Sequence, residues 1–380
     1  MQTRVSEMLG VEFPILAFSH CRDVVAAVTN AGGFGVLGAV AHTPEQLEID
    51  LGWIEEQTKG RPYGLDLLLP TKYAGADEGG LDRDTIRQLL PAEQQEFVDD
   101  ILRRYQVPEL PDDLSVFGRG GALSISPKGY EPLLDIAFAH KISLIASALG
   151  PPPPWLIERA HGSSVVVAAL AGTRVHAERH KAAGVDLIVA QGTEAGGHTG
   201  EISTMVLVPE VVDAVTPTPV LAAGGIATGR QIAAAMALGA EGVWCGSVWL
   251  TTEEAETMPA VKEKFLAATS RDTVRSRSLT GKPARMLRSA WTDEWEREDA
   301  PDPLPMPLQT ALVAEAQLRI ARAATKEGSG ANELANYFVG QVVGQLDRVK
   351  PARQVVLDMV TEYVDAIERL AHQLEAAAGS

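Results

Sequence analysis

The sequence predicts an α/β protein built on a closed (β/α)8 barrel of the TIM type, with a smaller helical domain and an insertion after the third strand. Two observations support this prediction. Eight short apolar runs recur between residues 13 and 247, and Ala-rich helical stretches separate most of them. Strands that are apolar throughout are typical of parallel sheets buried on both faces. Eight alternating units indicate that the sheet closes into a barrel.

The first units show the local signals clearly. Residues 13–19 form the first predicted strand, residues 22–31 a helix and residues 34–40 the second strand. The next helix begins with Thr43, whose hydroxyl suits an N-cap, followed by Pro44 and then by Glu45 in the first turn. The remaining predicted strands are residues 63–69, 142–146, 165–170, 187–191, 220–223 and 243–247, and helices are clearest at 174–183 and 229–238.

Two segments interrupt this alternation. Residues 70–119 form a polar insertion with a helical stretch at 91–104. Residues 271–340 follow the eighth strand and contain no clear strand, and four closely spaced prolines form a stiff connector before a helix at 308–324. We therefore expect a barrel over residues 1–270, a helical lid or substrate domain over 271–340, and a C-terminal segment over 341–380. In that segment an amphipathic helix, 354–377, should pack back on the barrel.

Composition excludes several classes of protein. The 380 residues include 33 Lys and Arg against 50 Asp and Glu, a formal net charge of −17, which disfavours nucleic acid as a partner. The longest stretch without these charged residues, 24–44, contains four glycines and is a poor membrane span. The start of the chain lacks a secretory pattern. Cys21 and Cys245 form no Cys-x-x-Cys motif, so we expect a cytoplasmic protein without disulfides.

One glycine motif imitates a nucleotide fingerprint. Residues 33–38 match Gly-x-Gly-x-x-Gly, which in dinucleotide-binding proteins follows a strand and opens a helix. Here a helical stretch precedes the motif and an apolar strand runs through it. We therefore interpret the first glycines as the end of a helix and the others as part of the second strand.

A stronger candidate follows the sixth predicted strand. Residues 191–200 read QGTEAGGHTG, and a loop after a barrel strand lies on the catalytic face. Gly196 and Gly197 let the backbone approach a flat or anionic ligand closely. His198 has a side chain suited to proton transfer. The alternative is a surface turn with an incidental histidine.

The next two units end in small residues. Gly224 and Gly225 follow the seventh predicted strand, and Gly246 and Ser247 end the eighth. Barrels often bind phosphate at these two loops. Close packing of helix on strand is the alternative reading. Cys245 is expected to be a buried filler and not a nucleophile.

A local group of basic residues interrupts the acidic chain. It could hold the anionic tail of a substrate, or it could be a solvated face paired with Asp293, Glu294, Glu296 and Glu298. We predict no metal site. The five basic residues considered for the substrate tail are Arg275, Arg277, Lys282, Arg285 and Arg288.

Together these motifs resemble the nitronate monooxygenase family, formerly called 2-nitropropane dioxygenases. The resemblance rests on residues 187–198, 222–226 and 246–247, with support from 9–14, 31–38 and Gly340-Gln341. The FMN-dependent enoyl-ACP reductase of bacterial fatty-acid synthesis belongs to the same superfamily. Two family motifs differ here: Gln-Ala-Pro-Met at the first strand is replaced by residues 16–19, LAFS, and Gly-x-Asn ends in Asp66.

The resemblance implies an FMN-binding barrel with His198 as the catalytic acid or base. It implies alkyl nitronate oxidation with O2. Reduction or dehydrogenation of an enoyl or cyclic acyl-CoA thioester, with NAD(P)H or another donor, is the alternative, and a non-catalytic flavin-binding protein is a second one. A homodimer is also an expectation. The implied FMN-binding residues are Ala17, Phe18, Asp66, Gln191, Gly196, Gly197, Ala223, Gly224, Gly225, Gly246, Ser247 and Gln341.

Overall fold

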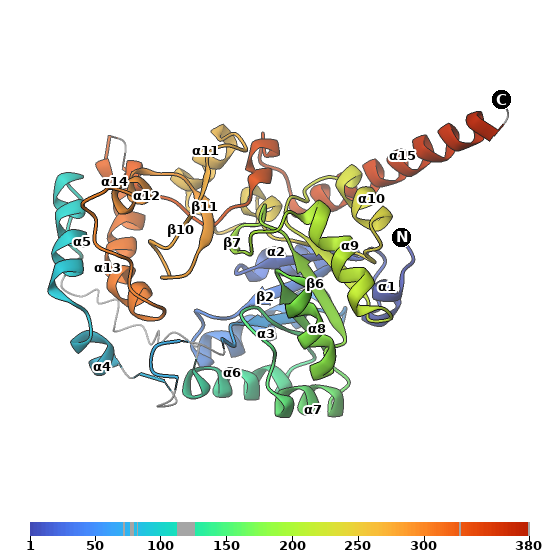
Figure 1. Ribbon diagram of the computed structural model, residues 1–380, viewed down its shortest axis with the longest axis horizontal. Coiled ribbons are helices and arrows are strands. Elements are labelled where there is room, and N and C mark those ends of the chain that lie inside the picture. The colour runs from blue at the N-terminus through green and yellow to red at the C-terminus, as the bar shows by residue number, and fades with distance from the viewer. Residues whose placement is uncertain (71–72, 77–79, 82, 112–125, 327, 379–380) are drawn as a thin grey trace.

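The computed structural model describes residues 1–70, 73–76, 80–81, 83–111, 126–326 and 328–378. Eight parallel strands close into a barrel, as the sequence predicts (Figure 1). Closure is visible in the register, because Ala17 lies opposite Gly35 on one side and Cys245 on the other. The barrel strands are β1 (Ile15–Ser19), β2 (Phe34–Gly38), β3 (Gly64–Leu67), β4 (Leu144–Ser147), β5 (Val166–Ala171), β6 (Leu187–Gln191), β8 (Val220–Ala223) and β9 (Val243–Cys245).

Helices surround the barrel, and their starts follow the predicted caps. The Thr43 hydroxyl accepts a hydrogen bond from the Gln46 N–H at 3.1 Å, and Pro44 occupies the first turn. The strand through the glycine motif at 33–38 is confirmed as β2. The surrounding helices are α1 (Arg4–Leu9), α2 (Arg22–Asn30), α3 (Pro44–Thr58), α6 (Pro127–Ala139), α7 (Pro154–Gly162), α8 (Arg174–Ala183), α9 (Thr204–Val215), α10 (Gly229–Ala237) and α15 (Ala352–Ala378).

The barrel strands are buried on both faces. One core fills the barrel interior, where Leu16, Phe34 and Leu187 pack with Val5 and Leu9 of α1. Helix α1 therefore plugs the end of the barrel opposite the catalytic face. The larger core lies between the strands and the surrounding helices. This double burial explains why the strand sequences are apolar without alternation.

A second lobe lies beside the barrel, on the left of Figure 1. It has its own apolar core, which includes Val98, Trp291, Val313 and Leu334. Helix α5 of the insertion packs on α13, so the described part of the insertion belongs to this lobe; residues 112–119 lie outside the described ranges. The helices of the lobe are α4 (Arg83–Gln88), α5 (Ala92–Arg104), α11 (Pro259–Ala267), α12 (Ala290–Trp295), α13 (Leu308–Ala323) and α14 (Gly330–Leu334).

The expectation that residues 271–340 contain no strand is wrong. Strands β10 (Thr273–Ser276) and β11 (Ala284–Leu287) pair antiparallel, and β11 also pairs with β7 (Gly197–His198). Each strand of this sheet is short, and β7 lies far from the other two in sequence, so no local pattern reveals the pairing. The sheet ties the His198 loop of the barrel to the second lobe.

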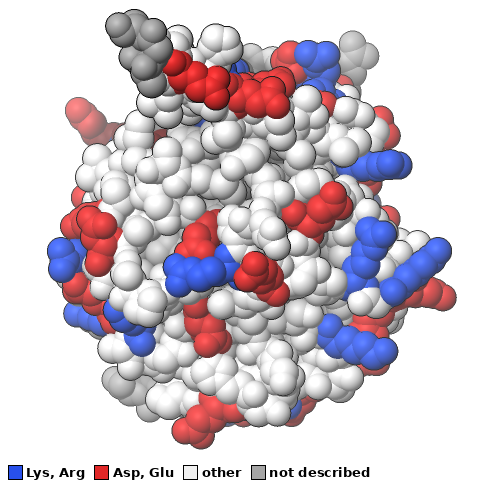
Figure 2. Space-filling view, turned by 90° about the vertical axis from the view of Figure 1, so that its right-hand side faces the viewer, with Lys and Arg blue, Asp and Glu red and all other residues white. Residues whose placement is uncertain are grey.

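Helix α15 packs on the barrel over only part of its length. Val356 and Met359 belong to the barrel core, Ala366 is also buried, and α15 lies along α10. From Ile367 to residue 376 every residue is exposed, and the end of the helix projects from the molecule (Figure 1). Figure 2, which views the molecule from this side, shows Lys and Arg scattered singly among acidic and uncharged side chains.

None of the described helices is both long enough and apolar enough to cross a membrane.

Candidate active site

A cavity of about 550 Å³ opens at the carboxyl ends of the barrel strands. It is bounded by loops of the barrel and by residues of the second lobe, among them Thr280, Met306, Tyr337 and Phe338. The volume lies within the usual range for small-molecule and cofactor sites. Eleven of the predicted site residues line it: Phe18, Asp66, Gln191, Gly196, Gly197, His198, Ala223, Gly224, Gly225, Gly246 and Ser247.

Two predicted cofactor residues do not line the cavity. Ala17 is fully buried in the barrel wall, because side chains alternate along β1 and its neighbour Phe18 faces the cavity instead. Gln341 begins the short helix η3 (Gln341–Gln345), and its backbone N–H donates to the Glu194 carbonyl at 2.9 Å. This hydrogen bond supports the glycine-histidine loop from behind.

His198 stands on β7, where the barrel meets the second lobe. Its Nε2 lies 2.9 Å from the Thr280 hydroxyl, and its ring lies 6.4 Å from that of Phe338. The single hydroxyl proton of Thr280 is donated to the Lys282 carbonyl at 3.1 Å, so Thr280 accepts from His198 Nε2–H. This arrangement leaves Nδ1 as the unprotonated ring nitrogen.

The surroundings keep His198 neutral. Burial lowers its pKa, and the nearby positive charge of Lys282 adds to the effect, giving a pKa of about 4. Within the part of the chain that the structure describes, Nδ1 has no hydrogen-bond partner. His198 therefore offers a free base at neutral pH inside a mostly apolar cavity.

The loops after β8 and β9 form a cradle of backbone N–H groups. Gly224 and Gly225 have φ of 92° and 72°, values that favour glycine. Among the described residues, the N–H groups of Gly225, Gly246 and Ser247 find no acceptor. Such a cluster of free donors, at the two loops where barrels bind phosphate, suits an anionic group.

Glycine is required in the loop after β6 for a different reason. A Cβ added to Gly196 would lie 2.8 Å from the Val339 backbone carbon. The chain at 339–340 thus presses directly on the loop, and the Gly340 N–H donates to the Ser247 hydroxyl at 2.8 Å. These contacts join three separate loops around the cavity.

Asp66 places a carboxyl group in the cavity wall. The residue is only 4% exposed, and its side chain has no hydrogen-bond partner in the described ranges. Burial alone raises its pKa well above the ordinary value. A buried carboxyl group without a protein partner is a group that a bound ligand would satisfy.

None of the five basic residues considered for a substrate tail lines the cavity. Arg285 is 8% exposed and donates to the Thr193 carbonyl at 2.8 Å and to the Thr273 hydroxyl at 3.0 Å. Arg275 and Arg277 donate to backbone carbonyls. Arg288 pairs with Asp293 at 2.7 Å, and Lys282 acts electrostatically on His198. The four arginines are thus engaged in contacts within the chain.

Several cavity residues had no signal in the sequence. Thr280 and Phe338 belong to segments without a motif, and only the folded chain brings them to His198. Trp244 stacks near Phe18 with ring centroids 6.2 Å apart. His20 follows β1 and also lines the cavity. For His20, unlike the others, the sequence did offer a signal, since a histidine stands directly after the first predicted strand.

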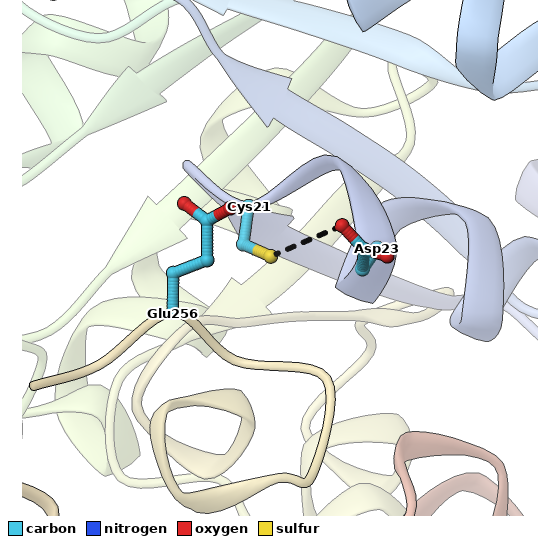
Figure 3. A group of neighbouring side chains, drawn as sticks. All are labelled: Cys21, Asp23 and Glu256. Atoms are coloured by element: carbon cyan, nitrogen blue, oxygen red, sulfur yellow. Dashed lines mark hydrogen bonds between the residues drawn. The ribbon is translucent and has the colours of Figure 1, made fainter. Parts of the chain in front are cut away.

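Cys21, Asp23 and Glu256 lie close together (Figure 3), and Cys21 and Glu256 also line the cavity. Their ligand atoms lie within 4.8 Å of one another. The Cys21 thiol donates to the Glu254 carbonyl at 3.1 Å, and burial raises its pKa. A thiol that is protonated and already bonded is a poor metal ligand, so we assign no ion to this group. Burial also raises the pKa of Cys245 to about 12, as expected for a filler.

Fold and site together define a class: a barrel protein with a small-molecule cavity, an anion cradle and a neutral histidine at the carboxyl ends of its strands. The chain belongs to the nitronate monooxygenase family, whose sequence profile matches residues 2–362. The protein is therefore an oxidoreductase of this family.

Relatives of the chain agree with this membership. It is 72% identical over 370 residues to a Mycobacterium tuberculosis protein named "Putative monooxygenase Rv1533", covering 97% of this chain and 98% of that one. It is 30% identical over 335 residues to a "Probable nitronate monooxygenase" of Staphylococcus saprophyticus, covering 83% of this chain and 88% of the relative.

Solved structures show the same architecture. Nitroalkane oxidase from Streptomyces ansochromogenes superposes with a TM-score of 0.78 at 26% identity, over 96% of this chain and 99% of that one. FabK from Thermotoga maritima superposes with a TM-score of 0.73 at 28% identity, over 98% and 99% of the two chains.

Proposed function

We propose that the protein is an FMN-dependent oxidoreductase that oxidises alkyl nitronates, and the corresponding nitroalkanes, with O2. The observation that carries the proposal is the state of His198. It is a neutral base with one free ring nitrogen, held in an apolar cavity. Removal of the proton from a neutral nitroalkane, which yields the nitronate, requires such a base.

The residues present fit FMN. The free N–H groups of Gly225, Gly246 and Ser247 would hold the phosphate. Gly196 and Gly197 leave room for a flat ring system, and the unpartnered Asp66 carboxyl offers a hydrogen bond to its polar edge. When bound, FMN would supply the electron-transfer chemistry that the side chains lack.

The chain itself positions and deprotonates the substrate. His198 Nδ1 would take the proton from the carbon that bears the nitro group, while Thr280 holds Nε2–H and thereby fixes the tautomer. Burial, with a smaller contribution from the charge of Lys282, lowers the pKa of the histidine, so the base is available across neutral pH. The apolar walls exclude water from the reacting carbon. A substrate supplied as the nitronate lacks this proton and needs no base.

The identity of the flavin tests the proposal. The protein, reconstituted with a mixture of FMN and FAD and freed of excess, should release FMN on heating. Recovery of FAD, or of no flavin, would contradict the assignment. Reduction of the bound flavin by NAD(P)H or by an acyl-CoA thioester, and not by a nitronate, would favour the thioester reaction instead.

The two buried free thiols, Cys21 and Cys245, support a cytoplasmic location.

A further inference from the structure

His20 lies at the carboxyl end of β1, in the loop that leads to α2, and it lines the same cavity as His198. Around the barrel, β9 and β8 separate β1 from β6, which precedes His198. The two histidines therefore approach the cavity from different sides. The His20 side chain is exposed to this space.

The orientation of the His20 ring is fixed by one hydrogen bond. Nδ1 lies 2.8 Å from the Gly38 carbonyl oxygen. A carbonyl oxygen can only accept, so Nδ1 carries the proton and Nε2 is the unprotonated nitrogen of the neutral ring. The edge of the ring also meets Phe18, with centroids 5.1 Å apart and an interplanar angle of 77°.

The backbone of β2 is shaped around this ring. A Cβ added at Gly38 would lie 2.7 Å from both Nδ1 and Cε1 of His20 and 2.9 Å from Cε2 of Phe18. Any residue other than glycine at position 38 would displace one of the two rings. The His20 ring is thus held from two sides, as expected for a side chain that presents a particular atom to a ligand.

Nε2 of His20 lacks a protein partner. No residue in the described ranges makes a hydrogen bond to it. The His20 ring is open to the cavity, but the protein groups packed around it displace bulk water and lower its pKa, so it stays neutral at pH 7 and Nε2 keeps its lone pair. The cavity wall therefore presents a fixed acceptor to its contents, and only a ligand with an N–H or O–H group can satisfy it.

We propose that His20 is a ligand-binding residue whose Nε2 accepts a hydrogen bond from a donor group of the bound flavin. This inference rests on the proposed function, which places FMN in the cavity. The donors of FMN are the single N–H of its oxidised ring system and the hydroxyls of its ribityl chain. A nitronate has only acceptor oxygens, so the substrate does not satisfy this nitrogen.

The test is the affinity of the reconstituted protein for FMN, measured from the flavin fluorescence that appears on dilution. His20→Phe keeps a ring but loses the acceptor, and binding should weaken by about threefold to tenfold, the size of one hydrogen bond. His20→Gln keeps an acceptor and should bind more tightly than His20→Phe. His176→Phe, the same substitution at an exposed helical position, should leave binding unchanged.

Position 38 gives an independent arm of the experiment. Gly38→Ala pushes the His20 ring aside and should weaken FMN binding as His20→Phe does. In a His20→Ala background only its contact with Phe18 remains, so the added effect should be smaller than in the wild type. If the wild type and His20→Phe bind FMN with equal affinity, the inference about His20 is wrong, while the proposed function still stands. No FMN binding by the wild type would overturn the proposed function with it.

Discussion

At the scale of single residues, His198 carries the proposed chemistry. His198→Ala should keep FMN but lose about 10²- to 10⁴-fold in the rate with neutral nitroalkanes, the usual contribution of a general base. Preformed nitronates should be affected much less because they need no deprotonation. Steady-state rates with both forms of one substrate check this. Equal losses for the two forms would show that His198 is not the base.

The pH dependence follows from the same residue. Because its pKa is about 4, the rate with nitroalkanes should rise through this pH and stay level to neutral pH. Lys282→Met removes the neighbouring positive charge, so the pKa should rise and the profile should move to higher pH. Rate profiles of the wild type and Lys282→Met measure the shift, and identical profiles would contradict the electrostatic role of Lys282.

The buried carboxyl group of Asp66 should make the protein less stable as the pH rises. The pKa of Asp66 in the folded protein is raised above its ordinary value of 3.8. At a pH between 3.8 and the raised pKa, the folded protein therefore binds a proton that the unfolded chain has released. The free energy of unfolding therefore falls as pH rises through this window. Asp66→Asn, uncharged and similar in shape, should be more stable than the wild type at pH 8 and equal to it near pH 4. Urea melts across this range should diverge; parallel curves would mean that Asp66 is ionised when folded.

Which site residues were predictable depended on their neighbours in sequence. His198 and the glycines at 196–197 and 224–225 stand directly after apolar strands, so their position on the catalytic face could be inferred. Thr280 and Phe338 reach the cavity only through the packing of the second lobe. Ala17 was misplaced because the inward and outward directions along β1 are not encoded in a strand apolar on both faces.

At the scale of elements, the loop after β8 should not tolerate a side chain. Gly225 has φ of 72°, a backbone conformation that residues with a Cβ rarely adopt. Gly225→Val should therefore abolish FMN binding by disturbing the cradle. Gly52→Ala, on α3 with open space around it, is the matched control. Retention of full FMN content by Gly225→Val would show that the loop after β8 does not hold the FMN phosphate.

The three-stranded sheet makes Arg285 a structural residue. Its guanidinium joins β11 to the Thr193 carbonyl in the His198 loop. Arg285→Met leaves that carbonyl without its partner and should cost about 1–3 kcal/mol of stability. Arg288→Met, at an exposed ion pair, should cost much less. Thermal melts compare the two variants, and equally small losses of stability would contradict the structural role of Arg285.

At the scale of the molecule, the barrel was predictable because each of its units repeats the same local pattern. The sheet of the second lobe was not, since β10 and β11 are short, include charged residues and pair with a distant third strand. The projecting end of α15 was also missed. The helical spacing of apolar residues continues past Ala366, but Ile367, Leu370 and Leu374 are exposed.

Shortening the chain tests that helix. Truncation after Ala366 removes no residue that the structure describes as buried, so the melting temperature should stay unchanged. Truncation after Lys350 also removes Val356 and Met359 from the core and should lower it strongly. If truncation after Ala366 lowered the melting temperature and also converted a dimer into a monomer in solution, the projecting segment would instead be the interface of the expected homodimer.

The central claim is that this cavity brings a nitronate to a bound flavin. The most direct measurement is the visible spectrum of the FMN-reconstituted protein mixed anaerobically with an alkyl nitronate. We predict rapid loss of the oxidised-flavin absorbance and its return when O2 is admitted. An unchanged spectrum with the nitronate, in a protein whose FMN is bleached by NAD(P)H, would contradict the account.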